Sequence, residues 1–184
     1  QFEAGKLIHN IQLASARIAN LVKSLKSYSR QDNNQADMID VRTGIKDTVL
    51  VLTNRLKFLD VNLELNEVPE TCARMGELNQ VWTNILVNAC DALTDGGQIS
   101  IKTWNDKKSI FVKISDNGPG IPVDILDRIF EPNYTTKNQG AKFGLGLGLA
   151  ISNQVVGKLG GTIEAKNNEV KGATFLISIP ITKC

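Results

Sequence analysis

The sequence has little histidine, little cysteine and almost no net charge. Its 184 residues contain one histidine, His9, and 21 Lys and Arg nearly offset 19 Asp and Glu, which leaves a formal net charge of +2. A single histidine excludes a histidine-rich metal site. The balance of charge offers no strong positive field for nucleic acid or an anionic membrane, so we expect no nucleic-acid partner. No apolar run approaches the roughly 18 residues that a membrane-spanning helix needs.

The three cysteines, Cys72, Cys90 and Cys184, are odd in number and far apart in the sequence. Such spacing is not that of a disulfide framework or a metal cluster, and it favours a reducing, cytoplasmic compartment. The chain starts at Gln1 without a signal peptide, so we expect part of a longer protein, either soluble or membrane-anchored. Its length and its apolar fraction of 42% fit one domain with an appendage.

The appendage is the segment at the start of the chain, which carries an apolar stripe. Residues 1–30 carry apolar side chains at spacings of three and four, which predicts a long amphipathic helix close to a heptad seam. Its stripe consists of Ile8, Ile11, Ile18, Leu21, Val22, Leu25 and Tyr28. The polar segment 31–36 predicts a linker. The stripe packs either on the following domain or, as we favour, on a helix outside this sequence or on a second chain, which predicts a homodimer.

Residues 37–184 mix helical and strand periodicity and form the main domain. Helical spacing predicts helices over 40–56, 77–93, 122–130 and 148–159. Alternation of apolar and polar residues predicts strands over 61–65, 99–104, 110–114, 162–165 and 173–179, the second and third forming a hairpin. The fold class is therefore α+β: a two-layer α/β sandwich with a mixed, mostly antiparallel sheet and helices on one face.

Two asparagines stand out within the predicted helix 77–93. Asn84 and Asn88 are four residues apart, which places both amides on one helix face. An amide oxygen is a hard ligand that suits Mg²⁺, an ion that takes its other ligands from phosphates and water. The alternative is that both amides are buried and bond to neighbouring backbone, and the pair alone leaves both interpretations open.

A tight turn follows the predicted strand 110–114. Its sequence, Asp116-Asn-Gly-Pro-Gly-Ile121, combines two glycines and a proline, so the backbone bends closely there. A carboxylate at a strand end can accept a hydrogen bond from an exocyclic amine such as that of adenine. The alternative is a solvent-facing turn that the aspartate caps.

A glycine-rich loop runs into the predicted helix 148–159. In Gly144-Leu-Gly-Leu-Gly148 the alternating glycines let backbone N–H groups approach an anion, and the helix adds the positive end of its dipole. No Gly-Lys-Ser/Thr follows, so this is not a P-loop, and its position in the chain does not fit a dinucleotide fingerprint. The alternative is a flexible hinge.

The order of these motifs, together with Phe130-Glu-Pro132 and Gly160-Gly-Thr162, resembles the catalytic, ATP-binding domain of sensor histidine kinases. More broadly it is similar to the ATP-binding fold that these kinases share with gyrase, Hsp90 and MutL, over roughly residues 37 to 181. The resemblance implies ATP and Mg²⁺ as ligands, transfer of the γ-phosphoryl group to a histidine, and a response-regulator receiver domain as partner. Residues 1–30 then resemble the second helix of the dimerisation and phosphoacceptor hairpin.

The resemblance also implies a role for each matching residue. Asn88 is the expected Mg²⁺ ligand, Asn84 a catalytic polar group near the γ-phosphate, and Lys137 a catalytic and phosphate-binding residue of the lid. Asp116 is expected to read adenine, and Phe130 matches the phenylalanine box. The other implied nucleotide-binding residues are Asp91, Gly118, Gly120, Ile121, Tyr134, Thr135, Thr136, Gly144, Leu145, Gly146, Leu147, Gly148 and Thr174.

Departures from the family pattern keep two alternatives open. Asn133, Phe143 and Leu145 are unusual for the lid, which allows a nucleotide-binding-deficient module for dimerisation or regulation. A serine kinase or an ATPase on the same fold is the other alternative, although Asn84 cannot take a proton from water. His9 lacks the acidic residue and the proline that follow the family's acceptor histidine, so we expect the acceptor upstream of residue 1.

Overall fold

A computed structural model of the chain describes residues 35–132, 134 and 147–184. The predicted helix 1–30 lies outside this range. The elements in chain order are β1 (Asp37–Ile39), α2 (Val41–Val51), α3 (Thr53–Leu56), β2 (Asp60–Leu65), β3 (Thr71–Ala73), α4 (Met75–Ala92), β4 (Gln98–Asn105), β5 (Ser109–Asp116), the 3₁₀ helix η2 (Leu126–Arg128), α5 (Gly148–Lys158), β6 (Thr162–Asn167) and β7 (Ala173–Pro180).

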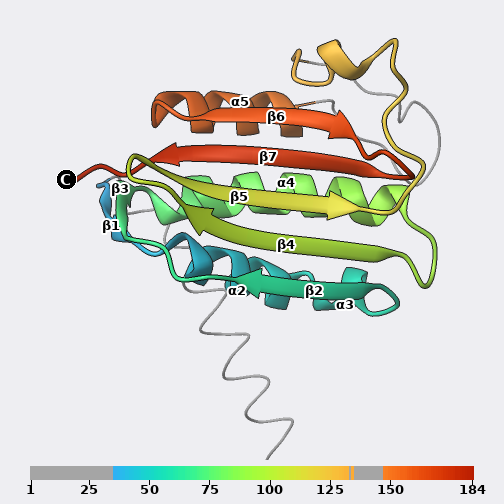
Figure 1. Cartoon of the computed structure of the whole chain (residues 1–184), viewed down its shortest axis with the longest axis horizontal. Coiled ribbons are helices and arrows are strands. Elements are labelled where there is room, and N and C mark those ends of the chain that lie inside the picture. The colour runs from blue at the N-terminus through green and yellow to red at the C-terminus, as the bar shows by residue number, and fades with distance from the viewer. Residues whose placement is uncertain (1–34, 133, 135–146) are drawn as a thin grey trace, which may run out of the picture.

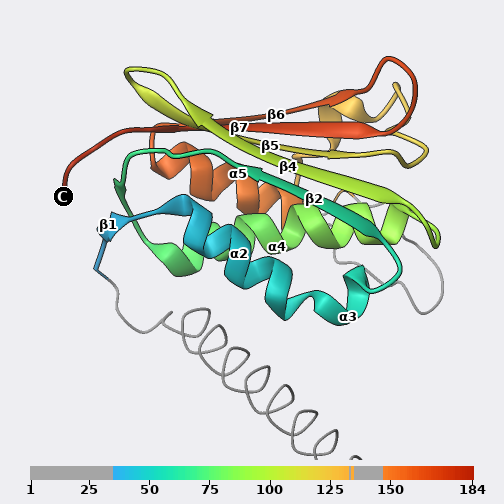
Figure 2. The same ribbon diagram turned by 60° about the horizontal axis from the view of Figure 1, so that its bottom comes forward.

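The main sheet has five strands in the order β2-β4-β5-β7-β6. Only the β2–β4 pair is parallel, and the remaining pairs are antiparallel. Helices α2, α4 and α5 all lie on the same face of this sheet (Figures 1 and 2). A small second sheet pairs β1 with β3. The predicted fold class, a two-layer α+β sandwich with a mixed, mostly antiparallel sheet, is confirmed.

Helix α4 forms the centre of the core, packed under the sheet and in contact with both α2 and α5. Its Leu78, Trp82 and Ile85 are fully buried, as are Ile101 of β4 and Ile177 of β7. Burying one large aliphatic side chain stabilises a fold by about 1.5–3 kcal/mol. The apolar residues that predicted a helix here are therefore the ones that pack against the sheet, and they leave Asn84 and Asn88 in less buried positions.

The predicted hairpin is confirmed as β4 and β5, with Ile101 opposite Ile114. Asp106 closes its turn, because one carboxylate oxygen accepts hydrogen bonds from the backbone N–H groups of Lys108 and Ser109, both at 2.7 Å. These two bonds hold the pKa of Asp106 below its ordinary value. A short polar side chain thus sets the register of two central strands.

Two local predictions needed correction, and two short strands were not predicted. The predicted helix 122–130 contains only η2, because its backbone bonds join residues three apart, as in Arg128 N–H to the Ile125 carbonyl at 2.8 Å. The predicted helix 40–56 is divided at Leu52 into α2 and α3. Strands β1 and β3 were not predicted, because three residues are too few to show alternation.

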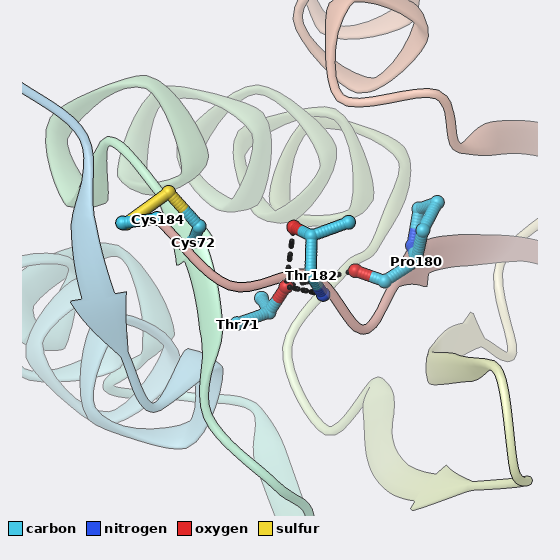
Figure 3. Close-up of a disulfide and its surroundings, with 5 residues drawn as sticks. All are labelled: Thr71, Cys72, Pro180, Thr182 and Cys184. Carbon is cyan, nitrogen blue, oxygen red and sulfur yellow. Dashed lines mark hydrogen bonds between the residues drawn. A yellow bond between two sulfur atoms is a disulfide. The ribbon is translucent and has the colours of Figure 1, made fainter.

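The expectation that the cysteines are unpaired was wrong. Cys72 of β3 and Cys184 form a disulfide with their Cα atoms 5.0 Å apart (Figure 3). Backbone bonds bring the segment after β7 to β3: Cys72 N–H donates to the Thr182 carbonyl at 3.0 Å, and the Thr71 hydroxyl donates to the Pro180 carbonyl at 2.8 Å. The two cysteines are 112 residues apart, so local spacing could not reveal the pair. The argument for a reducing compartment assumed that the cysteines form no disulfide, and it no longer holds.

Cys90 of α4 is a free cysteine. Burial raises the pKa of its thiol above the ordinary value, and the nearby charge of Asp91 acts in the same direction. None of the helices within the described part of the chain is long and apolar enough to cross a membrane.

Candidate nucleotide-binding site

Several of the predicted site residues gather at one end of the sheet, on the right in Figure 1. The carboxyl end of β5, the C-terminal end of α4, the N-terminus of α5 and the β6–β7 hairpin all lie there. A Cβ placed on Gly118 would lie 3.5 Å from the Ala92 carbonyl oxygen and 3.5 Å from a methyl group of Leu93. The Asp116 turn therefore packs directly against the end of the asparagine-bearing helix.

The carboxylate of Asp116 is held in place at the end of β5. Its Oδ1 accepts hydrogen bonds from the backbone N–H groups of Gly118, at 2.8 Å, and Ala173, at 3.3 Å. Among the described residues, nothing bonds to its Oδ2. One oxygen therefore caps the turn, and the role of the carboxylate as an acceptor for adenine stays a prediction.

Asn84 connects α4 to the beginning of α5. Its Nδ2 donates to the Gly148 carbonyl at 2.8 Å and to the Ser152 hydroxyl at 3.1 Å. The Ser152 hydroxyl also donates to the Gly148 carbonyl at 2.9 Å. A Cβ on Gly148 would lie 3.3 Å from Asn84 Oδ1, so glycine allows the two helices to approach closely at this point.

The N-terminus of α5 has the geometry expected of an anion-binding helix end. Leu147 is its N-cap residue, and no side-chain hydrogen bond caps the helix there. The first N–H groups of a helix have no partner within the helix, and the helix dipole makes this end positive. Because Asn84 holds Gly148, this end is fixed next to the face of α4 that carries Asn88.

Three further predicted site residues have contacts in the structure. Asp91, at the end of α4, forms an ion pair with Arg55 of α3 at 3.3 Å. Phe130 packs edge-on against Phe175, with the ring centroids 6.5 Å apart, which anchors the segment after η2 to the core. The Tyr134 ring lies 4.6 Å from the Arg128 guanidinium.

Thr174 does not join the Asp116 carboxylate. In the β5–β7 register it lies opposite Ser115, one residue away from the buried pair Ile114 and Phe175. Because side chains alternate along a strand, Thr174 and Ser115 face the side of the sheet away from the helices. The neighbouring Ala173 is the residue that contacts Asp116, through its backbone N–H.

The remaining predicted contacts lie outside the described residues and stay predictions: Thr135, Thr136, Lys137, Gly144, Leu145 and Gly146. Conversely, the sequence did not single out Asn167, Asn168 or Gly172, which the structure places against the Asp116–Ile121 turn. Their only signal was that asparagine and glycine favour turns, which carries no information about what a turn contacts.

Gly172 should not tolerate a side chain. Its φ is +94°, and an added Cβ would overlap the Asp116 carbonyl oxygen. We expect Gly172→Ala to lower the free energy of unfolding by about 2–4 kcal/mol, measured by urea denaturation. The matched control is Gly157→Ala in α5, where a Cβ meets nothing within 4 Å and where alanine should be neutral or slightly stabilising. Equal stability of the two variants would contradict the close approach.

A strand-end carboxylate, an amide-bearing helix and an uncapped helix N-terminus at one end of a two-layer sandwich are the features expected of a nucleotide-binding domain. Comparison with known families identifies which one. Residues 75–183, more than half of the chain, match the model of the histidine kinase-, DNA gyrase B- and HSP90-like ATPases, and the chain belongs to this family.

Curated relatives are sensor kinases. Sensor kinase CckA of Brucella abortus (strain 2308) is 32% identical over an alignment 191 residues long. The alignment takes in 94% of this chain and 20% of CckA. Histidine-protein kinase AtoS of Escherichia coli (strain K12) is 34% identical over 168 residues, which cover 89% of this chain and 27% of AtoS. The chain thus spans between about a fifth and two fifths of the length of such relatives.

Solved structures agree with this assignment. The nucleotide-free catalytic domain of histidine kinase ThkA is 26% identical with a TM-score of 0.73, and the match covers 81% of this chain and 99% of that domain. ThkA in complex with its response regulator TrrA is 26% identical with a TM-score of 0.67, covering 96% of this chain and 51% of that one. The described domain is the ATP-binding catalytic domain of the sensor histidine kinase type.

Proposed function

We propose that this domain binds Mg·ATP and transfers the γ-phosphoryl group to a histidine upstream of residue 1. The observation that carries the proposal is the Asp116 carboxylate. Two backbone N–H groups fix one of its oxygens, and the other has no partner among the described residues. A fixed acceptor of this kind suits the exocyclic amine of adenine, because the carboxylate is already held in position before the ligand binds and loses little conformational freedom on binding.

The other parts of the site supply contacts for the phosphates. The positive end of α5 stabilises phosphate charge, and Asn84 positions that helix end through Gly148 and Ser152. The amide oxygen of Asn88 suits Mg²⁺, which when bound neutralises charge that builds up on the phosphates. Lys137 would add a further positive charge. Such a transfer depends mainly on positioning and charge stabilisation, which these residues provide.

The partners follow from the same proposal. The acceptor histidine lies on a helix that pairs with residues 1–30, and the apolar stripe of that segment makes the kinase a homodimer. A response-regulator receiver domain then takes the phosphoryl group. The complex of the similar kinase ThkA with its response regulator supports this last partner.

Calorimetric titration with a non-hydrolysable ATP analogue and Mg²⁺ tests the proposal. We expect micromolar binding, and we expect Asp116→Asn to weaken it by about 30-fold to 100-fold. The asparagine Oδ1 keeps both bonds to the backbone, but an NH₂ group replaces the oxygen that would accept from adenine. Asp37→Asn, the same change on the exposed strand β1 at the other end of the molecule, should bind as the wild type does.

Three outcomes would count against parts of the proposal. A wild-type chain that binds no ATP analogue would favour the nucleotide-binding-deficient module. Rapid steady hydrolysis of ATP by this chain would favour the ATPase alternative. Full binding by Asp116→Asn would remove the role of Asp116 and leave the rest intact.

A further inference from the structure

The turn between β6 and β7 holds both ends of the Asp116–Ile121 turn. At one end, Asn168 Nδ2 donates to the Asp116 carbonyl at 2.9 Å. At the other end, Asn167 bonds the backbone of Ile121 twice: its Oδ1 accepts from the N–H at 2.7 Å and its Nδ2 donates to the carbonyl at 2.7 Å. Two consecutive side chains therefore bracket the segment that carries the Asp116 carboxylate.

The orientation of the Asn168 side chain is fixed by a contact on the face of the sheet that lies away from the helices. Its Oδ1 accepts from the Thr174 hydroxyl at 2.6 Å, and that hydroxyl lies 2.7 Å from the Ser115 hydroxyl. Thr174 is only 2% exposed, so this contact is shielded from water. The second Nδ2 bond of Asn168, to the Lys171 carbonyl at 3.1 Å, closes its own turn. The position of Asp116 is thus linked to Thr174 and Ser115, whose side chains face away from the helices.

Asn117 ties the beginning of the turn to β4, because its Oδ1 accepts from Gln98 N–H at 2.8 Å and its N–H donates to the Gln98 carbonyl at 3.2 Å. The rest of the turn depends on support from elsewhere. Gly118 and Gly120 have no side chains with which to anchor it, and Gly120 adopts a φ of +82°. The hydrogen bond from Ala173 N–H to the Asp116 carboxylate is long, at 3.3 Å, whereas the asparagine bonds to the turn lie between 2.7 and 2.9 Å. Most of the restraint between the hairpin and the turn therefore comes from Asn167 and Asn168.

We propose that Asn167 and Asn168 are positioning residues that set the selectivity of the site for adenine by fixing the backbone at both ends of the turn that begins with Asp116 and ends with Ile121. This inference rests on the proposed function of Asp116. Adenine presents an amine that donates to a carboxylate, whereas guanine presents a carbonyl oxygen at the same place, which cannot donate. Displacement of Asp116 therefore weakens binding of ATP without an equal loss for GTP.

The test measures the affinity of this chain for non-hydrolysable analogues of both ATP and GTP, with Mg²⁺. In Asn168→Ala the dissociation constant for the ATP analogue should rise about tenfold, as expected for the loss of its one hydrogen bond to the Asp116 turn, while the GTP value changes less than about twofold. The isosteric Thr174→Val removes only the hydroxyl that orders Asn168, and it should shift the ATP value in the same direction by about threefold. Melting temperatures are measured alongside.

The matched control is Glu169→Gln, an exposed neighbour in the same turn, which should leave both affinities unchanged. Equal weakening for the ATP and GTP analogues in Asn168→Ala would show a merely structural role and overturn the inference. Unchanged ATP affinity in a folded Asn168→Ala protein would do the same and leave the proposed function standing. A wild-type chain that does not prefer the ATP analogue would overturn both.

Discussion

Replacing Asn88 by alanine should abolish Mg²⁺-dependent phosphorylation in the full-length kinase while the domain remains folded. Asn88 lies in the last turns of α4, one turn beyond Asn84, and alanine is the best helix-forming residue. Among the groups that the variant loses is the amide oxygen proposed to bind Mg²⁺. Loss of a metal-binding group that stabilises the transferring phosphoryl group should cost at least about a hundredfold in rate, measured with γ-labelled ATP.

Two variants separate this role from a structural one. Asn88→Asp supplies another hard oxygen ligand and should retain part of the activity, with a changed dependence on Mg²⁺ concentration. Asn84→Ala should instead lower the melting temperature, because Asn84 Nδ2 holds Gly148 and Ser152 at the start of α5. Unchanged phosphorylation by a folded Asn88→Ala kinase would rule out Asn88 as the Mg²⁺ ligand.

Features that repeat along the sequence could be predicted. Helix α4 carries enough apolar residues at helical spacing to be recognised, and the same periodicity places Asn84 and Asn88 on one face. The β4–β5 hairpin was recognisable because each strand has eight residues, long enough to alternate clearly. Both predictions rest on local periodicity, and the apolar residues that show this periodicity are the ones that pack in the core.

Features that depend on contacts distant in sequence could not be predicted. The bonds from Asn167 and Asn168 to the Asp116–Ile121 turn join segments about fifty residues apart, and they arise only when β7 pairs with β5. The face of the sheet on which Thr174 lies could not be predicted for a related reason. A shift of one residue along a strand reverses the face, and the residue types at positions 173 and 174 do not reveal which of them points toward the helices.

Reduction of the Cys72–Cys184 disulfide should lower the free energy of unfolding by about 3–5 kcal/mol, because the bond closes a loop of about 110 residues and removes chain entropy from the unfolded state. Urea denaturation of Cys72→Ser against the wild type measures this loss. Cys90→Ser is the matched control, since Cys90 is free and the exchange breaks no cross-link. Native oxidised protein should present one alkylatable thiol and reduced protein three, with Cys90 reacting slowly because burial raises its thiol pKa.

The loss of the disulfide should affect stability far more than nucleotide binding. The bond ties the segment after β7 to β3, which pairs with β1, and all of these lie at the end of the sheet opposite the Asp116 turn (Figure 1). Effects of distant sites usually add without coupling, so Cys72→Ser should keep its ATP affinity within about twofold below its unfolding transition. The bonds of Thr71 to Pro180 and Thr182 remain after reduction and should hold the two segments together. Equal stability of Cys72→Ser and Cys90→Ser would show that the cross-link contributes nothing, and a large loss of ATP affinity would show that the two ends of the sheet are coupled.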